Sequence, residues 1–277
     1  MRFDMHCHTK EGSIDGRVSV EDYIRILKEK GYQGMLVTDH NSYNGYRFWK
    51  KELKDQEKDF VVLKGIEYDT INAGHMLVIM PEGVKPRILE VRGMPVSLLL
   101  TVVHAYGGIV GPAHPYGEKY MSFAGTKMYK RLKDPLMRKF DFVETFNACE
   151  PPESNQAARE LARAYYLPGF GGSDSHRESC LGLGYTEFKK PITCESDLIE
   201  AVKRKAPVRA GGQYYHGTTK EKIGAVNNVL VYSFWLYNLV TALFRTHKRH
   251  VKGRYLELGR TASPGNLPMP AEQPEEM

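Results

Sequence analysis

Short apolar runs alternate with longer amphipathic stretches along most of the chain. The short runs are rich in Val, Ile, Leu and Phe and are bounded by Gly, Pro or polar residues, which is the pattern of buried strands. This pattern predicts strands over residues 3–9, 33–38, 60–67, 75–80, 109–113, 140–146, 167–173, 183–188 and 208–212. The amphipathic stretches predict helices over residues 19–30, 43–58, 95–106, 153–165 and 195–205.

The first predicted helix has capping signals at both ends. Ser19 is the expected N-cap, because Asp22 follows three residues later, where a capping acid is commonly found. Gly31 is expected to end the helix, and the next strand begins soon afterwards. Strands and helices that alternate with short connections imply a parallel sheet.

The pattern changes after residue 212. Residues 213–261 are predicted to form a helical and basic extension, and residues 262–277, which hold four prolines, a disordered tail. A helix is expected over residues 222–244, with an apolar centre shorter than the roughly 20 residues that span a bilayer. We expect this helix to pack on the flank of the main domain. The alternatives are a dimer contact and an interfacial membrane helix.

Composition and charge exclude several classes of protein. The chain of 277 residues is 42% hydrophobic and 26% charged, as in an ordinary globular protein. Five of its six net positive charges lie within residues 245–254, so the main domain is not expected to be a basic nucleic-acid platform. Strand-like sequence begins near residue 2 and leaves no room for a signal segment, so we expect a cytoplasmic protein. The cysteines show neither disulfide-framework nor zinc-ribbon spacing; they are Cys7, Cys149, Cys180 and Cys194.

The first strand carries a metal-chelating pair. Side chains at positions i and i+2 of a strand share a face, so His6 and His8 project together, with Asp4 one step behind them. Imidazole is a common ligand of zinc, iron and manganese, and a carboxylate behind a ligating ring can fix its tautomer. Cys7 points to the opposite face and is expected to be a small buried residue. Asp39, at the end of another strand, is expected to fix its loop.

Ligand-type side chains recur at the ends of several other strands. Taken singly, Asp15 is equally explained by a turn before Gly16, and His75 by a hydrogen bond at a strand end. The coincidence of positions favours a metal site, and a set of nine suits two or three ions, particularly if one carboxylate bridges. The nine are His6, His8, Asp15, His40, Glu67, His75, His114, Asp174 and His176.

The positions of these ligands also predict the architecture. Nearly all of them lie at the C-terminal ends of different strands, where a parallel barrel assembles its active site. We therefore predict an α/β fold over residues 1–212, a distorted TIM-like (β/α)7 barrel with a metal site at its C-terminal mouth. Residues 213–261 would be a helical extension of this domain.

Five short motifs identify a resemblance to a known family. From residue 3 to about residue 188, the sequence resembles the polymerase and histidinol phosphatase (PHP) superfamily of metal-dependent phosphoesterases, and the motifs follow one another in the order found in that family. The resemblance implies a distorted (β/α)7 barrel with a trinuclear metal centre at its mouth. The matching motifs are Asp4-Met5-His6-Cys7-His8-Thr9, Thr38-Asp39-His40, Gly65-Ile66-Glu67, Ala113-His114-Pro115 and Gly172-Ser173-Asp174-Ser175-His176.

The resemblance also implies how the ligands are shared among the ions. One ion would be held by the first pair of histidines together with Glu67 and Asp174. Glu67 would bridge to a second ion held by His75 and His114. A third ion would be held by Asp15, His40 and His176. Two to three divalent ions are expected, and ligation without thiolate does not choose among manganese, iron and zinc.

The expected chemistry follows from such a centre. A hydroxide between the two ions that Glu67 joins would attack phosphorus in line, and we assign Glu67, Asp174 and His176 to the catalytic set. The third ion and a cation would stabilise the phosphoryl oxygens. The candidate for bidentate phosphate contact is Arg177. Alternatively, Arg177 is a surface residue of a loop with no role in binding. Other candidates for the pocket lining are Asn147, Tyr116 and Lys119.

These features predict a metal-dependent hydrolase of phosphate esters. We favour a phosphomonoesterase that acts on a small phosphorylated metabolite or nucleotide. One alternative is a phosphodiesterase or exonuclease on short nucleic acid, which only the basic residues 245–254 favour. The other is a non-catalytic module that binds metal for structure or docks a partner, and the complete set of ligands argues against it. No transmembrane segment is expected.

Overall fold

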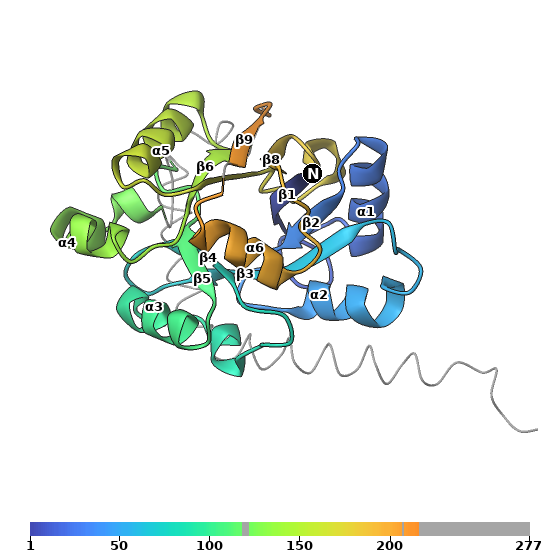
Figure 1. The fold of residues 1–277 in the computed structure, drawn as a ribbon, viewed down its shortest axis with the longest axis horizontal. Helices are drawn as coiled ribbons and strands as arrows, with labels where there is room; N and C mark the ends of the chain where they lie inside the picture. The colour runs from blue at the N-terminus through green and yellow to red at the C-terminus, as the bar shows by residue number, and fades with distance from the viewer. Residues whose placement is uncertain (118–121, 207, 216–277) are drawn as a thin grey trace, which may run out of the picture.

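The computed structural model describes residues 1–117, 122–206 and 208–215 (Figure 1). Its strands are β1 (Arg2–Cys7), β2 (Gly34–Val37), β3 (Val61–Asp69), β4 (His75–Ile79), β5 (Ile109–Pro112), β6 (Val143–Asn147), β7 (Gly169–Gly172), β8 (Gly184–Phe188) and β9 (Val208–Gly212). Its α-helices are α1 (Val20–Glu29), α2 (Asn44–Phe48), α3 (Val96–Ala105), α4 (Lys127–Met137), α5 (Pro152–Ala164) and α6 (Glu195–Lys203). The strands match the predicted set to within a few residues.

The strands form a seven-stranded sheet in the order β5-β4-β3-β2-β1-β8-β9, and a two-stranded sheet of β6 and β7. β1, β2 and β3 are parallel, as predicted, but β4 is antiparallel to both of its neighbours and β8 is antiparallel to β1. The expectation of a parallel sheet throughout was therefore wrong. Residues 70–74 join β3 to β4 directly, and such a short connection can make a hairpin but not the crossover of a dozen or more residues that parallel strands need.

The two-stranded sheet contacts β1 of the larger sheet on one side and β5 on the other. The backbone N–H of Asp174, just after β7, donates to the carbonyl of His6 in β1 at 2.9 Å. On the other side, the N–H of Asp141, just before β6, donates to the carbonyl of Val110 in β5, also at 2.9 Å. The described residues thus have an α/β fold around a curled sheet, with α1 to α5 outside it (Figure 1). α6 lies across the middle of the view and packs against the side of the sheet that Leu36 faces.

Alternation along the strands divides the core into layers. In β2, Met35 and Val37 pack with the buried face of α1, whereas Leu36 packs on the opposite side with Phe3 and Phe170. Successive side chains of a strand point to opposite faces, so a strand that is covered on both faces is apolar at every position. Burying each such side chain contributes roughly 1.5–3 kcal/mol.

The capping signals of the first helix are confirmed. The Ser19 hydroxyl accepts a hydrogen bond from the N–H of Asp22 at 3.1 Å, and α1 extends from the next residue, Val20. Gly31 follows the C-cap with a φ of 78°, in the left-handed region that favours glycine. Both ends of the helix are therefore fixed by local sequence.

Two helices differ from the prediction. The helix expected over residues 43–58 is α2 followed by a π-helical turn, and ends at Leu53. α4 was not predicted: its sequence is basic and contains Pro135, although Met128, Leu132 and Leu136 recur at helical spacing. The backbone of α4 is kinked at Leu132, with φ −132° and ψ 27°. Proline removes one hydrogen bond of a helix and disfavours helical geometry just before it.

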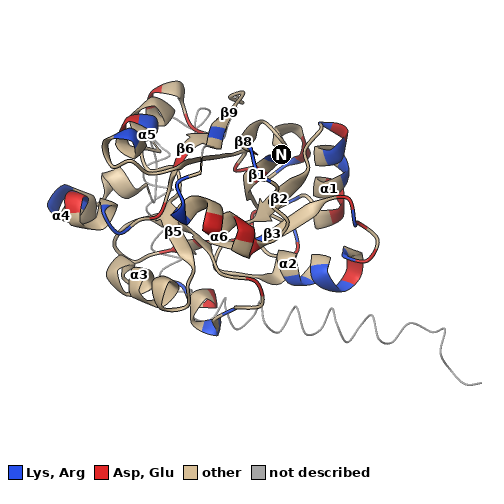
Figure 2. Cartoon of the chain, in the orientation of Figure 1, with Lys and Arg blue, Asp and Glu red and all other residues tan. Residues whose placement is uncertain are grey.

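The outer helices carry charges of both signs. Figure 2 shows Lys and Arg beside Asp and Glu on α1, on α4 and on the π-helical turn that follows α2. Within the described ranges, no helix is long and apolar enough to cross a membrane. The predicted helix 222–244, the basic residues 245–254, the tail 262–277 and Lys119 lie outside the described residues.

Candidate metal centre

Side chains of ligand type converge at one end of the curled sheet. β1, β2 and β3 are parallel, and β5 runs in the same direction because it is antiparallel to β4, so their C-terminal ends lie at one edge. The antiparallel direction of β4 brings its first residue, His75, to that same edge. The reversed strand therefore explains why this histidine opens its strand while the other ligands follow theirs.

Four atoms from β1, β3 and the end of β7 form a compact group. His6 Nε2 and His8 Nε2 lie 3.2 Å apart. They are 3.4 and 3.2 Å from Glu67 Oε2, and 3.6 and 3.2 Å from Asp174 Oδ1. The ligands of a tetrahedral ion, with bonds of about 2.0–2.2 Å, are about 3.3–3.6 Å from one another. The spacing of the two imidazole nitrogens and the Glu67 oxygen therefore fits a single transition-metal ion, and Asp174 lies beside both imidazoles.

The second oxygen of Glu67 faces another pair of histidines. Glu67 Oε1 lies 2.8 Å from His75 Nδ1 and 3.0 Å from His114 Nε2. Although His75 Nδ1 is buried and close to this oxygen, it has no hydrogen bond of suitable geometry with any described residue. Two acceptors that face each other in this way are expected where a cation belongs between them. The donor set of imidazoles and carboxylate suits zinc, iron or manganese.

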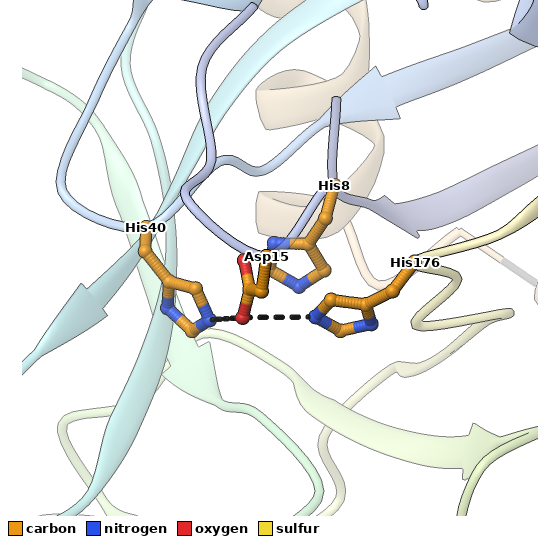
Figure 3. A group of neighbouring side chains, drawn as sticks. All are labelled: His8, Asp15, His40 and His176. Atoms are coloured by element: carbon orange, nitrogen blue, oxygen red, sulfur yellow. Dashed lines mark ion pairs between the residues drawn. The ribbon is translucent and has the colours of Figure 1, made fainter. Parts of the chain in front are cut away.

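A third group lies nearer to solvent (Figure 3). Asp15 Oδ2 is 3.5 Å from His40 Nε2 and 3.2 Å from His176 Nε2. The His8 ring stacks between the rings of His40 and His176, with centroids 4.6 and 4.4 Å apart. The structure thus brings together the three residues that the resemblance grouped and adds His8 to them. His40 also belongs to a group with Glu67 and His75.

Mutual charge dominates the electrostatics of the centre. Burial disfavours the charged form of every group here. The surrounding imidazoles nevertheless hold the pKa values of Glu67 and Asp174 well below their usual range. Despite burial, the carboxylates raise the pKa of His6 well above its usual value and that of His8 to about 9. The acids are thus stabilised by positive charge, which divalent cations supply in exchange for protons.

Two of the converging residues have an unusual backbone conformation. Asp174 and His114 have φ values of 50° and 26°, which cost non-glycine residues of order 1–3 kcal/mol. Hydrogen bonds hold both in place: the N–H of Asp174 donates to the carbonyl of His6 at 2.9 Å, and that of His114 to Glu144 Oε2 at 2.6 Å. The fold thus maintains strained backbone where both side chains face the centre.

Glu144 orients a ring of the centre, and it was absent from the predicted set. Its Oε1 lies 2.9 Å from His6 Nδ1, which leaves His6 Nε2 to face the other ligand-type atoms. The expectation that Asp4 fixes a ring was wrong: Asp4 Oδ1 instead accepts from the N–H groups of His6 and Ser173. Glu144 reaches the ring because β6 lies across the centre, a contact that spacing within one strand does not indicate.

Asp69 was missed as well, although its sequence position is informative. It is two residues after Glu67 on β3, so both side chains share a face. Asp69 Oδ1 lies 3.3 Å from His40 Nδ1 and 3.2 Å from His75 Nε2. Its Oδ2 lies 3.0 Å from a guanidinium nitrogen of Arg92. The spacing rule that identified the first histidine pair would also have found this carboxylate.

The candidates for substrate contact are placed differently from one another. Arg177 is exposed in the loop after His176. Asn147 is buried, and its amide nitrogen donates to Glu144 Oε2 at 3.2 Å and to Asp174 Oδ2 at 3.1 Å. The Tyr116 hydroxyl is 2.6 Å from that of Tyr129, and the ring packs against the core. Of the three, only Arg177 is exposed.

Two expectations about neighbouring residues are confirmed. Cys7 is fully buried among apolar side chains. Asp39 accepts hydrogen bonds from the N–H of Thr9 at 2.6 Å and from the N–H of Gly45 at 3.2 Å, so it holds its own loop to the loop after β1 and to the start of α2.

Comparison with family models identifies the class of protein. The model of the PHP domain matches residues 4–150, and the model described as PHP-associated matches residues 152–207. The first match alone spans more than half of the chain, which therefore belongs to the PHP family. Among proteins of curated function, none matches the chain significantly in sequence.

Solved structures share the fold at low sequence identity. PsfC from Pseudomonas syringae has 15% identity and a TM-score of 0.56, over 84% of this chain and 99% of that one. A protein described as a metal-dependent phosphoesterase, from Bifidobacterium adolescentis, has 15% identity and a TM-score of 0.54, over 73% and 96%. An endonuclease Q in complex with a 27-mer duplex has 18% identity and a TM-score of 0.54, over 75% and 57%. Such identities show a common fold and assign no substrate.

The family and the clustered donors agree on the reaction class. The chain is a hydrolase of the PHP type, a metal-dependent phosphoesterase, with His, Asp and Glu clusters that are able to bind metal.

Proposed function

We propose that the protein is a phosphomonoesterase that acts on a small phosphorylated metabolite or nucleotide. The observation that supports this most is the position of Glu67, whose two oxygens face two different groups of histidines. A carboxylate in that position suits a pair of ions held close together, as in enzymes that displace a phosphate ester in line.

We infer that two to three manganese, iron or zinc ions occupy the centre. His6, His8, Glu67 and Asp174 would hold the first, and the predicted groups around Glu67 and around Asp15 the others. Bound ions lower the pKa of water, so that hydroxide is available at neutral pH, and they withdraw charge from phosphoryl oxygens. The nine ligands proposed for this centre are His6, His8, Asp15, His40, Glu67, His75, His114, Asp174 and His176.

The chain's own residues would orient and separate these ions. Glu67 would fix the distance between two of them, and Glu144 would hold the ring of His6 in the ligating tautomer. Asp174 is supported by Asn147, so we assign to this amide a positioning role rather than contact with substrate. His176 stands at the solvent side of the centre, next to the exposed Arg177, where an incoming phosphate would arrive.

The fold proposal extends the curled sheet to a complete ring. We propose that β1 to β7 form a distorted (β/α)7 barrel, which the hydrogen bonds between β1 and the end of β7 and between β5 and the start of β6 support. Residues 1–212 would be this domain, residues 213–261 a helical extension and residues 262–277 a tail.

Two alternatives differ in substrate or in activity. A phosphodiesterase or exonuclease would use the same centre, and the common fold with an endonuclease Q gives this reading its support. A non-catalytic metal-binding module would need no nucleophile. Against it stands the presence of an acid or imidazole at each of the nine positions.

The test is metal analysis of purified protein followed by two hydrolysis assays. We expect two or three ions per chain after reconstitution, and faster hydrolysis of p-nitrophenyl phosphate than of bis-p-nitrophenyl phosphate. Chelation should abolish turnover and metal addition should restore it, with the Asp174→Asn protein as a control for contaminating phosphatase. Preference for the diester would favour the exonuclease reading. A fully loaded protein that hydrolyses neither ester would contradict the enzymatic proposal.

A further inference from the structure

We propose that Ser13 is a positioning residue of the metal centre, whose hydroxyl holds the ring of His8 in the tautomer that presents Nε2 to the first ion. The assignment rests on the metal-dependent phosphatase function proposed above. Ser13 is buried, with 6% of its surface exposed. Its Oγ lies 3.2 Å from His8 Nδ1 and accepts a hydrogen bond from the N–H of His40 at 3.0 Å. Ser13 thus contacts two residues of the centre without being one of the nine proposed ligands.

The ring of His8 lies between two groups of ligands. Its Nε2 is 3.2 Å from both His6 Nε2 and Glu67 Oε2, in the group proposed for the first ion. The same ring stacks between the rings of His40 and His176, in the group nearer to solvent. A neutral imidazole has one nitrogen that carries a proton and one with a free lone pair. The position of that proton therefore decides which nitrogen of His8 can bind an ion.

The hydrogen bonds of Ser13 favour one of the two tautomers. An ion at His8 Nε2 requires the ring proton to be on Nδ1, which then donates to the Ser13 oxygen. The N–H of His40 can only donate, so it occupies the other lone pair of that oxygen. Glu144 has the corresponding position for His6, where its Oε1 lies 2.9 Å from Nδ1. The two rings of the first group would therefore be oriented by different partners, a carboxylate and a hydroxyl.

A short turn fixes the Ser13 hydroxyl in this position. The N–H of Ser13 donates to the carbonyl of Thr9 at 2.8 Å, and the N–H of Gly12 donates to the Thr9 hydroxyl at 3.2 Å. The Thr9 hydroxyl donates in turn to Asp39 Oδ2 at 2.9 Å. A Cβ at Gly12 would overlap the Asp39 carboxylate, so the turn needs glycine there. The hydroxyl is thus held in place before an ion arrives, which limits the ordering that binding requires.

Ser13 also connects the first group of ligands to the group nearer to solvent. Asp15 follows it by two residues on the same loop, and Asp15 Oδ2 lies 3.5 Å from His40 Nε2. The backbone of His40 is itself a partner of the Ser13 hydroxyl. Removal of the hydroxyl should therefore free the ring of His8 to turn and break the link between this ring and the loop that carries His40.

The experiment compares wild type with Ser13→Ala, Ser13→Thr and Ser19→Ala. Ser19→Ala is the matched control, because it also removes a hydroxyl that accepts from a backbone N–H, at the start of α1 rather than in the centre. Zinc affinity is measured by competition with a chelator, metal content by elemental analysis and folding by thermal melting. In zinc-loaded, isotopically labelled protein, NMR detects the Nδ1–H proton of His8, which is assigned through its bonds to the ring.

We expect Ser13→Ala to weaken zinc binding by roughly 10- to 100-fold, as is typical when a residue that orients a ligating ring is lost. The Nδ1–H signal of His8 should broaden or vanish, because the proton loses its acceptor. Ser13→Thr keeps the hydroxyl and should recover most of the affinity. Ser19→Ala should bind zinc like wild type, although its melting temperature falls with the loss of the helix cap.

Two results would overturn the proposal. One is a zinc affinity of Ser13→Ala within twofold of wild type. The other is a folded Ser13→Thr protein that binds zinc as weakly as Ser13→Ala, since the hydroxyl would then not account for the loss.

Failure of the proposed function has a different outcome. If wild type binds zinc in a Ser13-dependent manner but hydrolyses no monoester, the phosphatase proposal fails and the assignment of Ser13 stands. If wild type hydrolyses the monoester and Ser13→Ala binds zinc equally well, only the assignment of Ser13 fails.

Discussion

Two pairs of buried carboxylates, far apart in sequence, have different partners in and around the centre. Glu67 and Asp174 face imidazole nitrogens, whereas Asp4 and Asp39 face backbone N–H groups and a hydroxyl. Burial raises the pKa values of Asp4 and Asp39 to about 6, because their hydrogen bonds offset it only in part. The pKa values of Glu67 and Asp174 lie well below the usual range despite equal burial.

The difference shows that the hydrogen-bond and charge partners of a buried carboxylate, rather than its burial, decide whether it can bind metal or only supports the fold. An acid surrounded by imidazoles is in an environment that a cation can share, whereas one that accepts N–H bonds already has its charge satisfied by fixed dipoles. Asp39 adjoins His40 in sequence, yet its oxygens accept from Thr9 and Gly45 and so connect the loop after β1 to the start of α2. Substitutions of Glu67 and Asp174 should therefore lower hydrolysis or metal binding, whereas substitutions of Asp4 and Asp39 should lower stability.

The largest effect is expected for Glu67→Gln. The amide replaces one ligating oxygen with a donor, so the two groups of histidines no longer share a bridging carboxylate. We expect hydrolysis of p-nitrophenyl phosphate to fall by roughly 10³-fold or more, with the fold retained in circular dichroism. The exposed Glu29→Gln is the matched control. Normal turnover by Glu67→Gln at full metal occupancy would show that Glu67 is not needed for hydrolysis.

Glu144→Gln should have the next largest effect. An amide cannot accept from His6 Nδ1–H on one side and from the N–H of His114 and the Asn147 amide on the other, so one contact becomes repulsive. Loss of such an orienting carboxylate typically costs 10- to 100-fold in metal affinity. Competition with a chelator measures it, with the exposed Glu153→Gln as control. An unchanged affinity would place Glu144 with the scaffold acids.

The sequence predicted more of the centre than of its surroundings. All nine proposed ligands lie at one edge because their positions at strand ends are a local property of each strand. Glu144 was missed because its contact with His6 joins strands that are far apart in sequence. The antiparallel direction of β4 was missed because strand pairing is also not a local property of the sequence. Asp69 carried a readable signal, two residues after Glu67. The sequence of α4 was misleading, because Pro135 argues against a helix there. The helix forms nevertheless, with a kink at Leu132.

Asp39→Asn should affect stability rather than chemistry. The carboxylate accepts from the N–H and hydroxyl of Thr9 and from the N–H of Gly45, and an amide cannot accept from all three. Leaving a buried N–H unsatisfied costs about 1–3 kcal/mol. Urea unfolding should be measured on metal-free protein, because bound metal adds its own stabilisation. If Asp39→Asn instead lost metal at normal stability, the division between the two sets would fail.

The smallest expected effect belongs to Tyr23→Phe, which tests how far the scaffold extends. The Tyr23 hydroxyl, from α1, donates to the carbonyl of Ser175 at 2.6 Å and lies 3.1 Å from that of His8, so it supports the contact between β1 and the end of β7 from outside. Removing one such bond costs about 1 kcal/mol. Both carbonyls belong to residues in or beside the centre. We therefore expect a modest loss of stability in urea, with kcat and chelator competition within twofold of wild type. A tenfold loss of metal affinity at unchanged stability would instead mean that the backbone position of His8 and Ser175 controls metal binding, and that Tyr23 of α1 contributes to the metal centre.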